Sequence, residues 1–162
     1  MWRPLKSFLR KSDLWRYHRR IKQALALHLR GEARNDGLTV DNVCSHLEIR
    51  WRARDIHPWD RHLAKYEKEV MFAEQVLLDT EAAVFRLFEN LPEVDVLELR
   101  VLEPESETLI AAGIVHRSDI STTRYHLLSV GMRLREIGVQ YHFATPGERD
   151  STVNTAIGDF AR

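Results

Sequence analysis

Alternating apolar and polar positions predict a β-strand over residues 45–56. One side would carry Leu47, Ile49, Trp51 and Ala53, and the other His46, Glu48, Arg50, Arg52 and Arg54. A strand with one apolar and one polar side is typical of a sheet that is covered on one face and open on the other. His57-Pro58 ends the strand, because proline cannot donate a hydrogen bond to a neighbouring strand.

Three more strands are predicted downstream. Residues 94–103 alternate in the same way, and Val139, Tyr141 and Phe143 alternate over residues 139–143. Residues 108–117 are almost entirely apolar, which suits a central strand buried on both faces.

Apolar residues recur every three to four positions in three other segments and predict helices there. These helices cover residues 13–30, 64–90 and 121–137. The middle helix is long for a small domain, so Asp79, as a capping residue, could mark a break within it. Gly138 ends the last helix.

The order from residue 45 onward is therefore β-α-β-β-α-β. This order predicts an α+β fold with a ferredoxin-like βαββαβ core, a four-stranded antiparallel sheet with two helices on one face. In that topology the first and third strands are central. The chain then divides into an N-terminal arm and loop with a basic amphipathic helix (1–43), the core (44–143) and a polar C-terminal tail (144–162).

The composition indicates a single folded domain. The chain has 162 residues, of which 44% are hydrophobic and 30% charged, a balance typical of globular proteins. Its one cysteine, Cys44, cannot form an internal disulfide, which favours a reducing compartment. We see no membrane span and no secretory signal, and so expect a cytoplasmic protein.

Charge is distributed unevenly, although the net charge is zero. Residues 1–34 contain ten basic and two acidic residues, whereas residues 69–107 contain eleven acidic and two basic ones. The basic arm could bind an acidic partner such as nucleic acid, or it could fold onto the acidic part of its own chain. The sequence leaves both interpretations open.

Candidate binding residues lie on the arm and on the first strand. They are Arg16, Arg19 and Arg20, with Glu48, Arg50, Arg52 and Arg54. The arginines could contact phosphates, although a solvated strand face is the simpler alternative. Base stacking on the sheet is not expected, because residues 109–116 contain no aromatic side chain.

Four chemically capable side chains follow the first strand. Asp55, His57, Asp60 and His62 lie within eight residues, and carboxylates and imidazoles serve as metal ligands and as acid–base groups. Their spacing matches no established ligand motif. The alternative is a structural turn, in which Asp60 caps the next helix and Trp59 seals the edge of the core.

No sequence motif specifies a reaction or a cofactor. Glycine-rich phosphate loops and the G-x-S-x-G motif are absent. The sequence therefore favours a non-enzymatic, intracellular binding or regulatory module. We expect it to act by protein–protein contact, as a homodimer formed through the open sheet face or the N-terminal helix. The alternatives are a nucleic-acid-binding module and a metal-dependent enzyme that uses the loop from Asp55 to His62.

Overall fold

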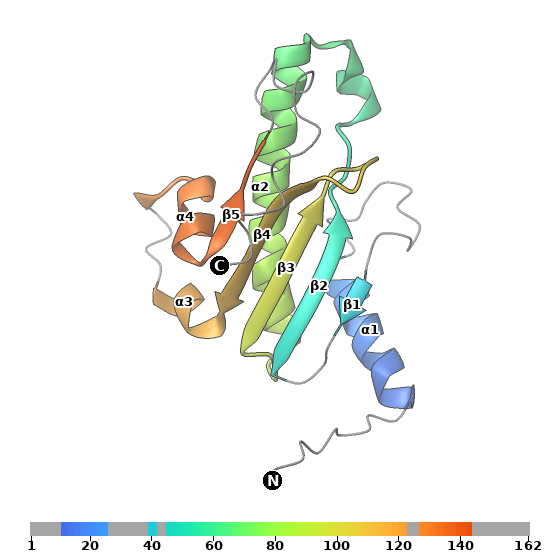
Figure 1. The fold of residues 1–162 in the computed structure, drawn as a ribbon, viewed down its shortest axis with the longest axis vertical. Coiled ribbons are helices and arrows are strands. Elements are labelled where there is room, and N and C mark those ends of the chain that lie inside the picture. Colours follow the sequence, from blue (N-terminus) through green and yellow to red (C-terminus); the bar gives the residue numbers. More distant parts are fainter. Residues whose placement is uncertain (1–10, 26–38, 42–44, 123–126, 144–162) are drawn as a thin grey trace.

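The computed structural model describes residues 11–25, 39–41, 45–122 and 127–143 (Figure 1). Its strands are β1 (Thr39–Asp41), β2 (His46–Arg52), β3 (Val96–Leu102), β4 (Leu109–His116) and β5 (Val139–Tyr141). Its helices are α1 (Lys11–Leu25), the 3-10 helix η2 (Pro58–His62), α2 (Lys65–Asn90), α3 (Arg117–Thr122) and α4 (Val130–Glu136). The chain is thus a mixed α+β protein, and none of the described helices has the length and apolar character to span a membrane.

The five strands form one mixed sheet in the order β1-β2-β3-β4-β5. β2 and β3 run parallel, with Ile49 opposite Leu99, and α2 connects them. The other three pairs of neighbours are antiparallel; for example, Leu99 lies opposite Gly113 of β4. Parallel neighbours need a long crossover, and α2 supplies it.

The predicted ferredoxin-like order and fully antiparallel sheet are therefore wrong. In that order β2 would pair with β4, but β3 lies between them. The alternation of residues determined which side of each strand is buried, but it carries no information about which strand is the neighbour. β1 was also missed, since residues 31–42 were expected to form a loop.

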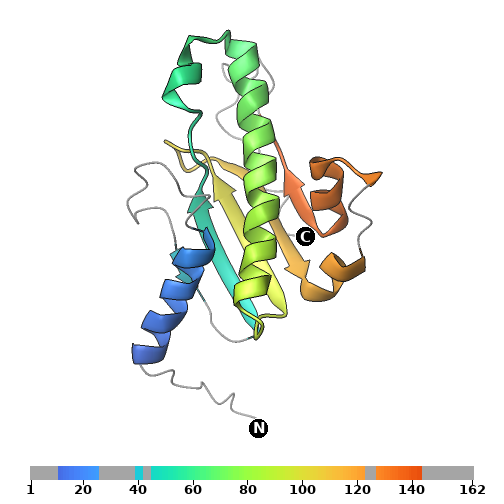
Figure 2. The same ribbon diagram turned by 180° about the vertical axis from the view of Figure 1, so that it is seen from behind.

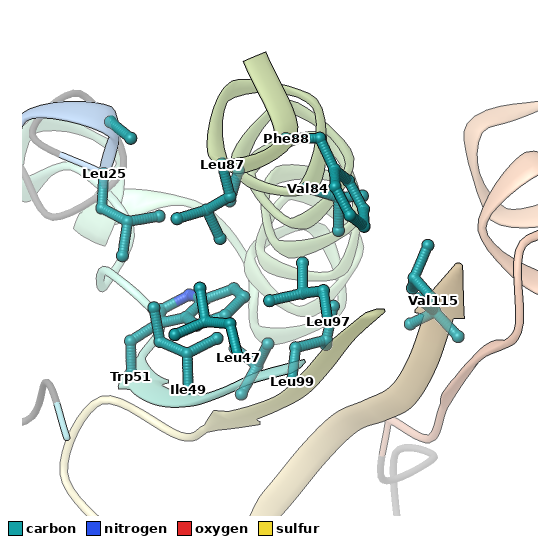
Figure 3. Close-up of a cluster of buried hydrophobic side chains, with 14 of the residues drawn as sticks. Leu25, Leu47, Ile49, Trp51, Val84, Leu87, Phe88, Leu97, Leu99 and Val115 are labelled. Atoms are coloured by element: carbon teal, nitrogen blue, oxygen red, sulfur yellow. The ribbon is translucent and has the colours of Figure 1, made fainter. Parts of the chain in front are cut away.

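The hydrophobic core lies between the sheet and the helices α1 and α2 (Figure 3). The sheet contributes Leu47, Ile49, Trp51, Leu97, Leu99 and Val115, and the helices contribute Leu25, Val84, Leu87 and Phe88. The predicted apolar side of the first strand is confirmed, because Leu47, Ile49 and Trp51 are all buried. Burial of each such side chain stabilises the fold by roughly 1.5–3 kcal/mol.

α2 is one continuous helix, so the predicted break at Asp79 is wrong. Asp79 does not cap a second segment; its carboxylate accepts two hydrogen bonds from Arg54, at 2.6 and 3.1 Å. Two residues further on, Glu81 accepts two from Arg133, at 2.6 and 2.8 Å. These two ion pairs therefore link the middle of α2 to the segment after β2 and to α4.

The N-terminal half of α2 extends past the ends of β2 and β3 (Figures 1 and 2). Its 26 residues correspond to about 39 Å of helix. The seven residues of β2 span only about 23 Å. Consequently every residue that is fully buried on α2 lies at Val76 or beyond it.

The helix predicted over residues 121–137 is instead two short helices. Ser129 has extended backbone angles, and its side chain accepts a hydrogen bond from the N–H of Met132, which starts α4. α4 then ends before Gly138, whose φ of 94° favours glycine. Within the predicted helix, Leu134 and Ile137 are buried, but Leu127 is exposed.

Several predictions fall partly or wholly outside the described residues. The helix expected over 13–30 is described as far as Leu25, and β5 ends at Tyr141. Cys44 and the tail over residues 144–162 lie outside the described part of the chain. The predicted boundaries between arm, core and tail stay predictions.

Candidate functional site

One face of the sheet is covered by no described helix (Figure 1), and it carries three of the seven predicted binding residues. We define the open face by the residues that share this side in the strand register. They are His46, Glu48, Arg50 and Arg52 on β2, Val96, Glu98 and Arg100 on β3, Ala112, Ile114 and His116 on β4, and Gln140 on β5. The expected grouping of Glu48, Arg50 and Arg52 is therefore present.

The charges on the open face largely compensate one another. Arg100 donates to Glu98 at 2.9 Å, and its guanidinium lies 3.8 Å from Glu48. His46 lies 3.6 Å from Glu98. Arg52 forms an ion pair with Glu107, and its guanidinium also donates to the backbone of the turn between β3 and β4. Such an ordered polar surface needs no partner to satisfy it.

The side chain of Arg54 does not lie on the open face. The strand ends at Arg52, and the guanidinium of Arg54 turns to α2, where it binds Asp79. The amide of Gln75 donates to the carbonyl oxygen of Arg54 at 2.9 Å and reinforces this junction. The three arginines expected to form a phosphate-binding row are therefore divided between two sides of the sheet.

The arginines of α1 are divided in a similar way. Arg16 and Arg19 are exposed, and Arg19 lies 5.7 Å from the centre of the Trp15 ring. Arg20 instead donates to Glu93, at 2.7 and 3.3 Å, and to the carbonyl oxygen of Asn90. This contact joins the basic arm to the acidic segment of the same chain. It agrees with the interpretation that the arm folds onto the acidic part of its own chain.

Arg20 also shifts the ionisation of its partner. Burial by itself would raise the pKa of Glu93, but the hydrogen bond and positive charge of Arg20 outweigh it. The backbone N–H of Glu93 and the charge of Arg117 act in the same direction as Arg20. The pKa of Glu93 consequently lies below its ordinary value.

The loop from Asp55 to His62 forms η2 and does not gather its side chains around one point. His57 accepts from the N–H of Trp59 at 3.3 Å, which starts η2, and the ring of His62 contacts the carbonyl of Trp59 at 2.6 Å. Asp55 lies 3.6 Å from Arg61. Across the described ranges, no group of three or more His, Cys, Asp or Glu side chains is placed to hold a metal ion. The predicted metal site at Asp55, His57, Asp60 and His62 gains no support.

The alternative interpretation of this loop also needs correction. Trp59 does not seal the core, because 81% of its surface is exposed. Asp60 does not cap α2 either, since the N-cap is Ala64, whose N–H donates to the Glu67 carboxylate at 3.0 Å. The loop is a turn held by its own backbone contacts.

A cavity of about 400 Å³ lies between the overhanging half of α2 and the adjacent edge of the sheet. Its apolar wall consists of Ile56, Phe72, Pro104, Ile110 and Phe143. Its charged groups are Asp55, Lys65, Lys68, Glu69, Glu103 and Glu105, so acids outnumber bases by four to two. Apolar walls with a few convergent polar groups are typical of small-molecule sites.

Glu69 is the most unusual group in this cavity. Its Oε2 atom is shielded from solvent and accepts no hydrogen bond from any described residue. By contrast, Glu103 accepts from the hydroxyl of Ser106 at 2.8 Å, and Asp55 lies near Arg61. A buried acceptor without a donor is costly, so Glu69 is the group that a ligand could satisfy.

Sequence reasoning missed this cavity, although one signal was present. Glu69 lies seven residues before Val76, and the buried positions Thr80, Ala83 and Leu87 continue the same side of α2. A carboxylate on the core-facing side of a helix is a reason to look for a site. The contributions of Ile110 and Phe143 could not be found without the strand order.

Comparison with models of known protein families, with curated proteins and with solved structures gives no match for this chain.

Proposed function

We propose that this protein is a binding module that acts by protein–protein contact and self-associates through the overhanging half of α2. The overhang surface is defined by the exposed apolar side chains of η2 and of α2 from its start to Leu78, namely Trp59, Tyr66, Val70, Met71 and Leu78. Its occupant is a second copy of the same chain.

The clustering of exposed apolar side chains is the observation that carries this proposal. Within the described residues, nine large apolar side chains are exposed, and five of them fall between residues 59 and 78. Tyr66 is 67% exposed and Leu78 53% exposed. Exposed apolar side chains that gather on one segment mark interaction sites more often than isolated ones do.

The amphipathic pattern of α2 supports the same conclusion. The stripe predicted from the sequence includes Tyr66, Val70, Val84 and Phe88, but only the last two are buried by the sheet and its helices. The helix thus carries an apolar surface longer than the core that covers it. A contact between copies would remove the remainder from water.

The mixed charges around the overhang surface favour a second copy of the chain over a partner that is uniformly positive or uniformly negative. The exposed Arg61 of η2 and Lys65 of α2 are close in the chain to the exposed Glu67 and Glu74 of α2. A surface of mixed sign can face itself across a two-fold axis, because basic groups of one copy can pair with acidic groups of the other.

The open sheet face, which the sequence favoured as a dimer contact alongside the N-terminal helix, has less in its favour. Its charged side chains are already paired within the chain, as in Arg100 with Glu98 and Arg52 with Glu107. Burial of such pairs between two copies would cost desolvation without new partners. The same pairing weakens the nucleic-acid alternative, in which Arg52, Arg54 and Arg20 would bind phosphates.

Light scattering coupled to size-exclusion chromatography tests the proposal on the full chain at low and high salt. We expect a dimer that survives high salt, because apolar contacts are not screened. The Met71→Lys/Leu78→Lys variant should be monomeric. The control is Ile114→Lys, which adds the same charge at an exposed apolar position of the open face and should stay dimeric. A monomeric wild-type chain at the highest concentration reached would refute self-association.

A further inference from the structure

We propose that the cavity beneath the overhanging half of α2 binds a small organic cation, a molecule with an apolar or aromatic body and an ammonium group. The cavity lies on the sheet-facing side of α2, whereas self-association uses its exposed side chains. The two proposals can therefore fail independently.

The size and the walls of the cavity define the body of the ligand. About 400 Å³ lies within the range that encloses small organic molecules. Phe72 and Phe143 contribute aromatic surfaces, and Ile110, which is itself buried, lies at the base of the apolar wall. The ring of Tyr141 on β5 lies 5.8 Å from that of Phe143 and packs behind it.

The carboxylates define the polar end of the ligand. Glu69 lines the cavity, and its enclosed Oε2 atom lacks a donor within the described chain. Rotation of the carboxylate toward the cavity would bring this acceptor to a ligand N–H, which would supply the missing hydrogen bond. The excess of acids over bases in the lining also favours a positive ligand over a negative one.

The two lysines of the lining do not remove this preference. Lys68 donates toward the carbonyl oxygen of Arg61 at 3.4 Å, which directs its ammonium group to the chain before α2. No ion pair between either lysine and Glu69 is formed within the described residues. The carboxylate of Glu69 thus has an acceptor that neither lysine uses, and an ammonium group that reached it would make a charge-assisted hydrogen bond.

The test uses three probes of the same shape and different charge: 2-phenylethylammonium, 2-phenylethanol and 3-phenylpropionate. Each is titrated into the full-length protein while amide chemical shifts are followed by NMR. We expect saturable binding of the ammonium probe, with shifts at Phe72, Ile110 and Phe143, weaker binding of the alcohol and none of the carboxylate.

Two variants distinguish binding of the probe in the cavity from binding elsewhere on the surface. Glu69→Gln keeps the shape of the side chain, so the fold should persist, and it should weaken the ammonium probe by about tenfold. Glu74→Gln removes the same charge from the exposed side of the helix and should leave the affinity unchanged. Equal binding by wild type and Glu69→Gln, or no saturable binding of the ammonium probe, would overturn the proposal.

Discussion

Arg117 holds its guanidinium 4.8 Å from the centre of the Phe88 ring and donates to the carbonyl oxygen of the same residue at 3.0 Å. It also donates to the carbonyls of Leu91 at 2.7 Å and of Val94 at 2.7 and 2.9 Å. The last carbonyls of a helix have no partner within the helix, and Arg117 supplies a donor to those of Phe88 and of the C-cap Leu91. Arg117 therefore fixes the C-terminal end of α2 to the end of β4.

Replacement of Arg117 by Met should lower the free energy of unfolding by about 2–4 kcal/mol, because the side chain fills similar space but donates nothing. Arg117→Lys should recover little of this loss, since an ammonium group cannot reach three carbonyls from one position. Urea unfolding followed by circular dichroism measures both effects. The control Arg16→Ala removes an exposed arginine of α1 and should change stability by less than about 0.5 kcal/mol.

The ion pair between Arg133 and Glu81 should contribute more to stability than that between Arg20 and Glu93. Both pairs form two hydrogen bonds, but the side chains of the first are 18% and 14% exposed and those of the second 41% and 42%. Double-mutant cycles with alanine should give a coupling of about 2 kcal/mol for the first pair. The more exposed pair should give less than about 1 kcal/mol. Equal coupling energies for the two pairs would show that burial does not determine how much each pair contributes to stability.

Glu93 should make stability dependent on pH in the acid range. The pKa of Glu93 is lowered in the folded state, so the ionised carboxylate stabilises the fold above the ordinary glutamate pKa. This contribution is lost as the pH falls through the lowered pKa. We expect Glu93→Gln to unfold at lower urea concentration than wild type near pH 6, and the difference to shrink toward about pH 3. Glu89→Gln, an exposed neighbour on α2, should show no such convergence.

The buried side of the first predicted strand could be read from the sequence, but the pairing of the strands could not. Leu47, Ile49 and Trp51 are buried as their alternation requires. The apolar run over 108–117 was expected to be buried on both faces, yet Ile114 is exposed on the open face. Alternation and composition describe a strand's own surfaces, whereas strand order depends on how connections such as α2 cross the sheet.

The candidate site could likewise be predicted from the sequence only in part. Glu48, Arg50 and Arg52 share a sheet face as predicted, because two-residue periodicity fixes that outcome. The turn of Arg54 toward Asp79 could not be foreseen, since their contact joins residues 25 apart in the chain. The cavity was hidden for a similar reason: Glu69, Ile110 and Phe143 become neighbours only once the sheet is assembled.

The sequential strand order has a consequence for the kinetics of folding. Every strand pairs only with the strands next to it in the chain, so no strand has to insert between two that are already paired. The long connection through α2 between β2 and β3 closes the largest loop of the sheet, and loop closure limits the folding rate of such topologies. We therefore expect the β2–α2–β3 unit to form the folding nucleus. β4 and β5 would then add at one edge, in the order in which the ribosome releases them.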